Sequence, residues 1–259
     1  MQKMKKYKGY LIDLDGTIYR GKEPIPAAKR FVEKLQQKGI PFLFVTNNST
    51  QDPEKVVRNL KLNFDINVNI DNVYTSGLAT ADYVADLDEN KRSAYVIGES
   101  GLRKALFDKG FRFEEEQPDY TIVGLDYDVT YHKFELATLT IQKGSKFIGT
   151  NADTNLPNER GLVPGAGSVI SLVECATQKK ATYIGKPEPI IMKKALQKIG
   201  LSNDEVIMVG DNYMTDILAG IRSNIDTLLV YTGVSTHELV RQKEIKPTFE
   251  VESLDEWNF

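Results

Sequence analysis

Two aspartates, Asp13 and Asp15, stand two positions apart at the end of a short apolar segment, residues 10–12. Because side chains alternate along an extended backbone, both carboxylates project to the same side. Gly16 then allows a sharp turn, and Thr17 adds a hydroxyl group. Two carboxylates this close repel each other, so both stay ionised near neutral pH only where a cation or fixed donors compensate them. The pattern therefore favours an oxygen-binding divalent metal.

A polar turn or a calcium loop can contain the same Asp-x-Asp-Gly stretch. A calcium loop of the EF-hand type needs further oxygen ligands at alternate positions and a closing glutamate. Here the chain continues with Ile18, Tyr19 and Arg20 instead. The sequence thus disfavours calcium.

Strand-like and helix-like segments alternate around this motif. Apolar residues at helical spacing predict a helix over residues 26–39, and the apolar residues 40–45 predict a strand buried on both faces. Later segments follow the same order: a helix at 190–199, a strand at 206–209, a helix at 214–221 and a strand at 227–231. This alternation predicts an α/β fold with a central parallel sheet.

In the middle of the chain, strand-like and helix-like segments alternate again. Strands are predicted at 94–97, 121–125 and 146–149, and helices at 102–109 and 132–143. A second, inserted domain is therefore expected in a chain of 259 residues, which is long enough for two. The predicted boundaries place residues 1–80 and 180–259 in the main domain and residues 81–179 in the inserted one.

Four strand-like segments end in polar residues. These residues are Asp13 with Asp15, then Thr46, then Lys186, then Asp211 with Asp216. The carboxyl ends of parallel strands share one edge of the sheet, where ligands bind, so the four groups are expected to converge. Carboxylates there suit Mg²⁺, and Thr46 and Lys186 suit the oxygens of a phosphate.

One carboxylate of such a site can attack phosphorus and form an aspartyl-phosphate. The other can give a proton to the leaving oxygen and later take one from water. Asp13 lies nearest the strand end, so we assign the attack to Asp13 and the proton transfers to Asp15.

Four motifs in this order resemble those of the haloacid dehalogenase-like superfamily of phosphohydrolases. They are DLDGT at 13–17, TNNS at 46–49, GKP at 185–187 and GDNYMTD at 210–216. The inserted domain is similar to the cap of the NagD and p-nitrophenylphosphatase branch. The resemblance covers residues 8–234 and implies a Rossmann-like three-layer core with an inserted α/β cap.

For the metal site, the resemblance implies that Asp13 is both nucleophile and Mg²⁺ ligand. Asp15 would be the general acid and base, with its backbone carbonyl as another ligand. Asp211 would be the remaining protein ligand, and Asp216 would orient a metal-bound water or lie behind the ligands.

For the substrate, the resemblance implies that Thr46 and the backbone amide of Asn47 hold the phosphoryl group. Lys186 would bridge the phosphoryl group and the nucleophile. Asn151 and Asp153 resemble the cap loop that faces the active site in this branch, and we assign them to substrate specificity.

The expected function is a Mg²⁺-dependent phosphatase acting on small phosphomonoesters, such as nucleotides, sugar phosphates or p-nitrophenyl phosphate. A phosphomutase would use the same Asp13 chemistry and return the phosphoryl group to the sugar. A signalling receiver phosphorylated on aspartate needs about half this length and has no use for a cap. A dehalogenase would need neither Asp15 nor a metal.

Composition limits the partners. The net charge is only -3, so no basic surface for nucleic acid is expected. No apolar run approaches the roughly 20 residues of a membrane span, and the charged Lys3, Lys5 and Lys6 lead straight into the first strand, so no signal peptide is expected. We therefore expect a soluble, cytoplasmic protein, with a homodimer left open. Cys175 lies in the apolar residues 169–176 and is expected in the core.

Overall fold

The computed structural model describes residues 6–158 and 160–258, so Lys3 and Lys5 lie outside the described part. The chain forms two compact units. Unit 1 consists of Met1–Thr46, Val56–Tyr74 and Lys186–Phe259, and unit 2 consists of Asn47–Lys55 and Thr75–Gly185. Residues 47–55, 75–80 and 180–185, expected in the main domain, thus group with unit 2. Residues 47–55 are tied to unit 2 by a backbone hydrogen bond, in which Gly101 N donates to the carbonyl oxygen of Thr50 at 3.1 Å.

Unit 1 contains a six-stranded sheet in the order β15-β14-β13-β1-β4-β5. Its strands are β1 (Gly9–Ile12), β4 (Phe42–Thr46), β5 (Val73–Thr75), β13 (Val206–Gly210), β14 (Asp226–Val230) and β15 (Phe249–Val251). The pairs β1 with β4, β1 with β13, β13 with β14, and β14 with β15 are parallel. β1 has β4 on one side and β13 on the other, so the strand order reverses beside it. The predicted parallel α/β sheet is confirmed.

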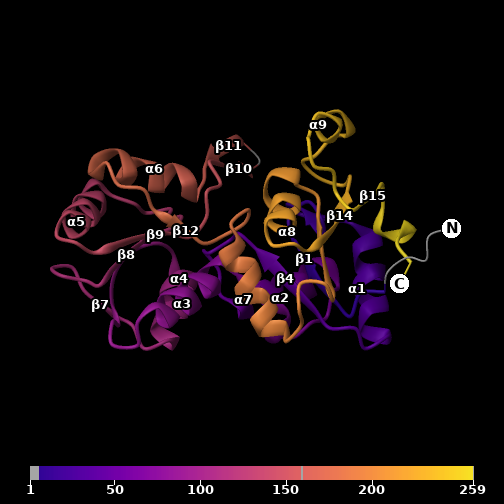
Figure 1. Cartoon of the computed structure of the whole chain (residues 1–259), viewed down its shortest axis with the longest axis horizontal. Coiled ribbons are helices and arrows are strands. Elements are labelled where there is room, and N and C mark those ends of the chain that lie inside the picture. Colours follow the sequence, from indigo (N-terminus) through magenta and orange to yellow (C-terminus); the bar gives the residue numbers. More distant parts are fainter. Residues whose placement is uncertain (1–5, 159, 259) are drawn as a thin grey trace. The chain divides into compact units, whose positions relative to one another are not determined.

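Helices cover both faces of this sheet, which gives the expected three layers (Figure 1). The principal helices are α1 (Pro26–Gln37), α2 (Pro53–Phe64), α7 (Pro189–Ile199) and α8 (Leu218–Arg222). Phe31 of α1 and Leu60 of α2 share one core with Tyr10 and Val209 of the sheet. Met208 points to the opposite face, since residues alternate along a strand. There it meets α8, where a Cβ on Gly220 would lie 3.4 Å from the Met208 Cβ.

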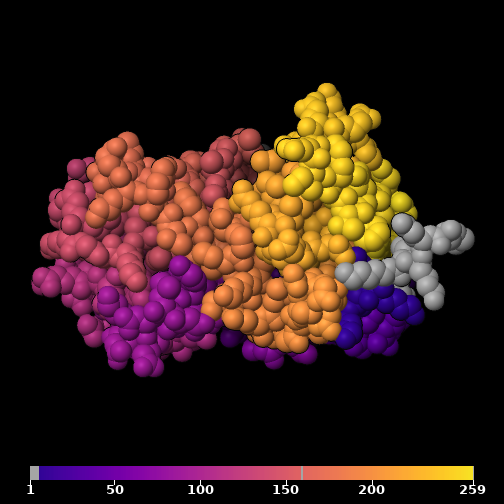
Figure 2. Space-filling view, viewed as in Figure 1, coloured from indigo at the N-terminus to yellow at the C-terminus, as the bar shows by residue number. Residues whose placement is uncertain are grey.

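The end of the chain packs back onto unit 1. Trp257 is only 5% exposed, and its indole nitrogen donates to the hydroxyl oxygen of Tyr10 at 3.1 Å. Its ring stacks on Tyr7 and meets Phe249 edge-on. Figure 2 shows this segment, from α9 (His237–Arg241) onward, as a continuous yellow surface of unit 1.

Unit 2 contains a parallel five-stranded sheet in the order β12-β9-β8-β6-β7. Its strands are β6 (Ser93–Ile97), β7 (Arg112–Phe113), β8 (Tyr120–Val123), β9 (Lys146–Gly149) and β12 (Thr182–Tyr183). Its helices are α3 (Ser76–Leu87), α4 (Ser100–Asp108), α5 (Tyr131–Gln142) and α6 (Ala166–Thr177), and β10 (Asn155–Asn158) pairs with β11 (Gly161–Pro164) as a hairpin. The predicted strands and helices of this region are present.

The expectation that Cys175 lies in the core is wrong, because Cys175 is exposed. The apolar stretch around it is the helix α6, which buries Val169, Ile170 and Val173 on one side. Residue 175 lies two positions beyond Val173, about 200° around a helix, and therefore points outward. No helix in the described part of the chain has the length and apolarity needed to cross a membrane.

Candidate active site

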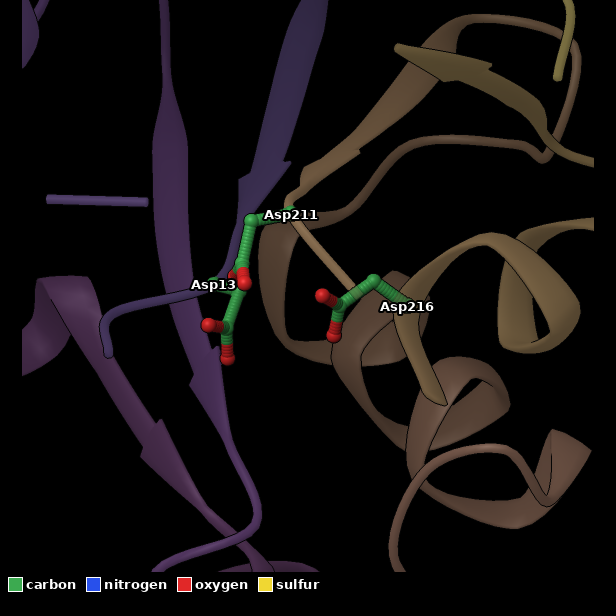
Figure 3. A group of neighbouring side chains, drawn as sticks. All are labelled: Asp13, Asp211 and Asp216. Atoms are coloured by element: carbon green, nitrogen blue, oxygen red, sulfur yellow. The ribbon is translucent and has the colours of Figure 1, made fainter. Parts of the chain in front are cut away.

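The carboxylates of Asp13, Asp211 and Asp216 meet at the carboxyl-terminal edge of the sheet in unit 1 (Figure 3). Asp13 directly follows β1 and Asp211 directly follows β13, while Asp216 lies in η2, the π-helical turn Tyr213–Ile217. One oxygen of each lies within 4.8 Å of the others, and the three residues are 8%, 1% and 1% exposed, respectively. Because β1 and β13 are parallel neighbours, their ends bring together aspartates that are distant in the sequence.

Lys186 supplies a buried positive charge to this cluster. Its ammonium group lies 2.5 Å from Oδ1 of Asp13 and 2.8 Å from Oδ1 of Asp216. It also donates to the carbonyl oxygen of Val45 at 2.7 Å, which fixes it to the end of β4. Lys186 is 1% exposed. Lysine is usually exposed, but Lys186 is held in the interior by three oxygen acceptors.

Burial and charge act in opposite directions on these groups. Desolvation raises the pKa of Asp13 well above its usual value, Lys186 opposes this, and Asp216 and Asp211 raise it further. Desolvation and Asp216 raise the pKa of Asp211 to about 6. Desolvation would lower the pKa of Lys186, but Asp13 and Asp216 outweigh it and raise that pKa. The cluster thus holds more negative charge than one lysine compensates.

Two donors hold the carboxylate of Asp211. The hydroxyl group of Thr17 donates to Oδ1 at 3.0 Å, and the backbone amide of Val234 donates to Oδ2 at 2.7 Å. Each oxygen keeps further lone-pair capacity. The sequence indicates the Thr17 hydroxyl at the strand end but not its contact with Asp211, and it does not indicate the Val234 contact. Thr17 belongs to the DLDGT motif and could have been included in the site on that basis. Val234 donates through its backbone amide, so its side-chain type does not indicate the contact.

Asp216 is fixed as firmly as the other two aspartates. Its Oδ2 accepts from the backbone amide of Asn212 at 3.0 Å, while its Oδ1 faces Lys186. A Cβ on Gly210 would lie 2.3 Å from the Asp216 Cβ, so the backbone at the end of β13 approaches this side chain closely. Asp216 belongs to the cluster itself, which the sequence alone left undecided.

The donor set fits a divalent metal. Three buried carboxylates offer hard oxygen ligands, and a cation of charge +2 would offset the desolvation and the repulsion that raise the pKa values of Asp13 and Asp211. The cluster could therefore hold a metal ion.

Asp15 stands apart from the three clustered carboxylates. Its side chain is exposed, and its Oδ1 accepts from the backbone amide of Gly21 at 3.3 Å. Nearby protein atoms remove part of its hydration and raise the pKa of Asp15, and the Gly21 amide opposes this. A raised pKa is the direction that suits a general acid.

Thr46 and Asn47 follow one another at the end of β4. Thr46 is 7% exposed. In unit 2, the side-chain amide of Asn47 donates to both oxygens of Asp153 at 3.1 and 3.2 Å. The carbonyl oxygen of Asn47 accepts from the Asn151 side chain at 2.8 Å and from the Ser76 hydroxyl at 2.5 Å. Asn151 and Asp153 thus both contact Asn47, a relationship that the sequence did not predict.

Comparison with protein families gives a match over most of the chain. Residues 10–112 match the model described as haloacid dehalogenase-like hydrolase, and residues 183–257 match the HAD-hydrolase-like model. This chain belongs to the haloacid dehalogenase-like hydrolases. The family predicted from the four sequence motifs is confirmed.

Two relatives are similar to the chain over nearly its whole length. It is 47% identical to the 5'-nucleotidase YutF of Bacillus subtilis, over 98% of both chains. It is 49% identical to the acid sugar phosphatase of Staphylococcus aureus, over 98% of this chain and 97% of that protein.

Solved structures of the family have the same fold. A mutant of the thermostable p-nitrophenylphosphatase of Bacillus stearothermophilus is 54% identical with a TM-score of 0.90, over 99% of this chain and 100% of that one. NagD from E. coli K-12 is 31% identical with a TM-score of 0.92, over 98% of this chain and 99% of that one. These similarities confirm that this haloacid dehalogenase-like hydrolase lies in the NagD and p-nitrophenylphosphatase branch.

Proposed function

We propose that this chain is a Mg²⁺-dependent phosphatase that hydrolyses small phosphomonoesters through an aspartyl-phosphate on Asp13. The observation that carries the proposal is the buried Lys186, held at 2.5 Å from Asp13 and 2.8 Å from Asp216 in a cluster of three carboxylates. Such an arrangement suits a nucleophile that must approach a negatively charged phosphoryl group. Similarity to enzymes named nucleotidase, acid sugar phosphatase and p-nitrophenylphosphatase supports it.

In the first step, a carboxylate oxygen of Asp13 attacks phosphorus, and the bond between phosphorus and the ester oxygen breaks. Asp15 gives its proton to the leaving oxygen. The product alcohol departs, and the phosphoryl group stays bonded to Asp13. The raised pKa of Asp15 supports the presence of that proton.

In the second step, Asp15 takes a proton from water as the water oxygen attacks phosphorus. The bond between phosphorus and Asp13 breaks, which releases inorganic phosphate and restores the carboxylate. Lys186, the Thr46 hydroxyl and the Asn47 backbone amide bind the phosphoryl oxygens as their charge develops.

Asp13 and Asp211 with the Asp15 carbonyl would hold Mg²⁺, and Asp216 would orient Lys186 and a metal-bound water. When bound, the metal supplies positive charge next to the nucleophile and the phosphoryl oxygens. We further propose that unit 2 is a cap and that Asn151 and Asp153 contribute to substrate selection. The cytoplasmic location and the homodimer stay predictions from the sequence.

The test follows free phosphate from nucleoside 5'-monophosphates, sugar phosphates and p-nitrophenyl phosphate with Mg²⁺ present. We expect release that EDTA abolishes and that Asp13→Asn lowers by about 10³-fold or more. Asp71→Asn makes the same chemical change at a side chain that is 91% exposed, so this variant should keep full activity.

Undiminished release by Asp13→Asn, or release that survives metal removal, contradicts the proposal. Conversion of a sugar phosphate to its isomer without free phosphate would indicate a phosphomutase instead. A protein that forms a stable aspartyl-phosphate and releases nothing would indicate a receiver.

A further inference from the structure

The loop that follows β14, residues 232–235, lies at the same edge of the sheet as the three aspartates. β14 is the parallel neighbour of β13, so its carboxyl end comes out beside Asp211. None of the four motifs found in the sequence includes this loop. We refer to residues 232–235 as the β14 loop.

The β14 loop contacts both aspartate motifs through hydrogen bonds. The Thr232 hydroxyl donates to the carbonyl oxygen of Gly16 at 2.7 Å, within the turn that follows Asp15. The backbone amide of Ser235 donates to the carbonyl oxygen of Asp211 at 3.1 Å. One short loop therefore connects the end of β1 to the end of β13.

The same loop fixes the carboxylate of Asp211. The Val234 amide donates to Oδ2 at 2.7 Å, opposite the Thr17 hydroxyl on Oδ1 at 3.0 Å. With one donor on each oxygen, rotation of the carboxylate is restricted. Each oxygen keeps further lone-pair capacity, and one oxygen of Asp211 lies within 4.8 Å of oxygens of Asp13 and Asp216.

Gly233 is what allows the loop to come this close. A Cβ placed on Gly233 would lie 1.9 Å from Oδ2 of Asp211 and 2.4 Å from its carboxyl carbon. Any side chain there would have to displace the loop or the carboxylate. Glycine is therefore required for contact between the loop backbone and Asp211.

The loop also supports the segment that carries Asp216. The hydroxyl oxygen of Ser235 accepts from the backbone amide of Tyr213 at 2.7 Å, and Ser235 is 6% exposed. Tyr213 is the first residue of η2, three positions before Asp216. The start of η2 is thus held against the β14 loop.

We propose that the β14 loop is a positioning element that sets the affinity of the acidic cluster for its divalent metal. Thr232, Gly233 and Ser235 are positioning residues, because they act through Gly16, Asp211 and Tyr213. The inference rests on the proposed function, since it takes Asp211 as a metal ligand. Groups that orient metal ligands typically change metal affinity by about 10- to 100-fold when they are removed.

The test measures the dissociation constant of Mg²⁺ by titration calorimetry on the full, metal-stripped chain, without substrate. Thr232→Val removes the hydroxyl donor and should weaken Mg²⁺ binding about tenfold, whereas Thr232→Ser keeps the donor and should bind within about twofold of the unaltered protein. Gly233→Ala should weaken binding further, because it disturbs the Asp211 carboxylate directly.

Thr130→Val is the matched control. It removes a threonine hydroxyl that accepts from the Lys133 amide at the start of α5, in unit 2, so it costs a hydrogen bond away from the cluster. We expect its Mg²⁺ affinity to be unchanged. If Gly233→Ala does not fold, the comparison of Thr232→Val with Thr232→Ser still tests whether the loop sets the Mg²⁺ affinity.

Equal Mg²⁺ affinity in Thr232→Val, Thr232→Ser and the unaltered protein overturns the role of the loop while leaving the phosphatase proposal intact. Equal weakening by Val and Ser at position 232 also overturns it, because the hydroxyl donor would then be irrelevant. An unaltered protein that binds no Mg²⁺ contradicts both this inference and the metal site of the proposed function.

Discussion

The ammonium group of Lys186 lies 2.5 Å from Oδ1 of Asp13, and both residues are buried. Taking two charges out of water has a large cost, which their mutual attraction only partly offsets. Removing one partner of such a pair destabilises the folded protein much more than removing both, because the remaining buried charge is then uncompensated. Around Lys186 this effect is amplified, since Asp216 also depends on the same ammonium group.

Replacement of Lys186 by methionine should therefore lower the free energy of unfolding of the metal-free protein by about 3–5 kcal/mol at neutral pH. Mg²⁺ should restore part of this loss, because it binds the folded state and compensates the carboxylates. Urea denaturation with and without Mg²⁺ measures both effects. Lys104→Met, which removes an exposed lysine paired with Asp108, should change stability far less. A Lys186→Met protein as stable as this control would contradict the prediction.

Metal binding should weaken in acid. The pKa of Asp211 is raised to about 6 by desolvation and by Asp216, so below this pH the carboxyl carries a proton that must leave before a metal binds. The affinity for Mg²⁺ should fall by up to about tenfold for each pH unit below about 6. Calorimetric titrations at about pH 5, 6 and 7 measure this. An affinity independent of pH over this range would show that Asp211 is not a ligand.

The same shift predicts how the metal-free protein responds to pH. The folded-state pKa of Asp211 lies above its usual value of 3.8, so proton binding favours the folded state. The resulting stabilisation is fully present below about pH 4 and is lost as the pH rises through about 6. Unfolding measured without metal should show this dependence in the unaltered protein and less of it in Asp211→Asn.

Much of unit 1 could be predicted because its strands are short apolar runs buried on both faces. Residues 10–12, 40–45 and 206–209 contain few polar residues, and polar residues follow each of them. Once the strands are parallel, geometry requires their ends to share an edge. Asp13 and Asp211 could be placed together on this basis, without any knowledge of their contacts.

The contacts missed by sequence analysis depend on the backbone or on tertiary packing. The Val234 amide and the Gly233 approach to Asp211 have no side-chain signature, and Asp216 reaches Lys186 only because η2 turns it inward. The apolar residues 169–176 predict a buried segment, but in the structure they belong to the helix α6, whose exposed side carries Cys175.

Trp257 should stabilise unit 1 without contributing to catalysis. Its ring lies against Tyr7 and Phe249, and its indole nitrogen donates to Tyr10. Trp257→Phe should cost about 1–3 kcal/mol through the lost hydrogen bond and poorer filling of space, and Trp257→Ala about 3–5 kcal/mol. Chemical denaturation measures the loss, and phosphatase activity per folded molecule should stay constant. A large activity loss in a fully folded Trp257→Phe protein would contradict a purely structural role.

Replacement of Asp153 should lower the activity toward every substrate, but not to the same extent. Its carboxylate accepts from the side-chain amide of Asn47, whose backbone amide is assigned to the phosphoryl group, so Asp153→Ala should shift Asn47 and lower kcat/KM by about tenfold for every substrate. If Asp153 also accepts from substrate hydroxyl groups, sugar phosphates and nucleotides should lose more than p-nitrophenyl phosphate, whose leaving group offers no such donor.

The comparison between substrates separates the two roles of Asp153. Asp108→Ala, an exposed aspartate on α4 in unit 2, is the control and should leave the order and the rates of all substrates unchanged. If Asp153→Ala lowers kcat/KM equally for every substrate, the contact with Asn47 matters for activity but Asp153 does not select the substrate. An unchanged kcat/KM for all of them would contradict both roles, because the contact of Asp153 with the Asn47 side chain would then not be needed to place the Asn47 backbone amide at the phosphoryl group.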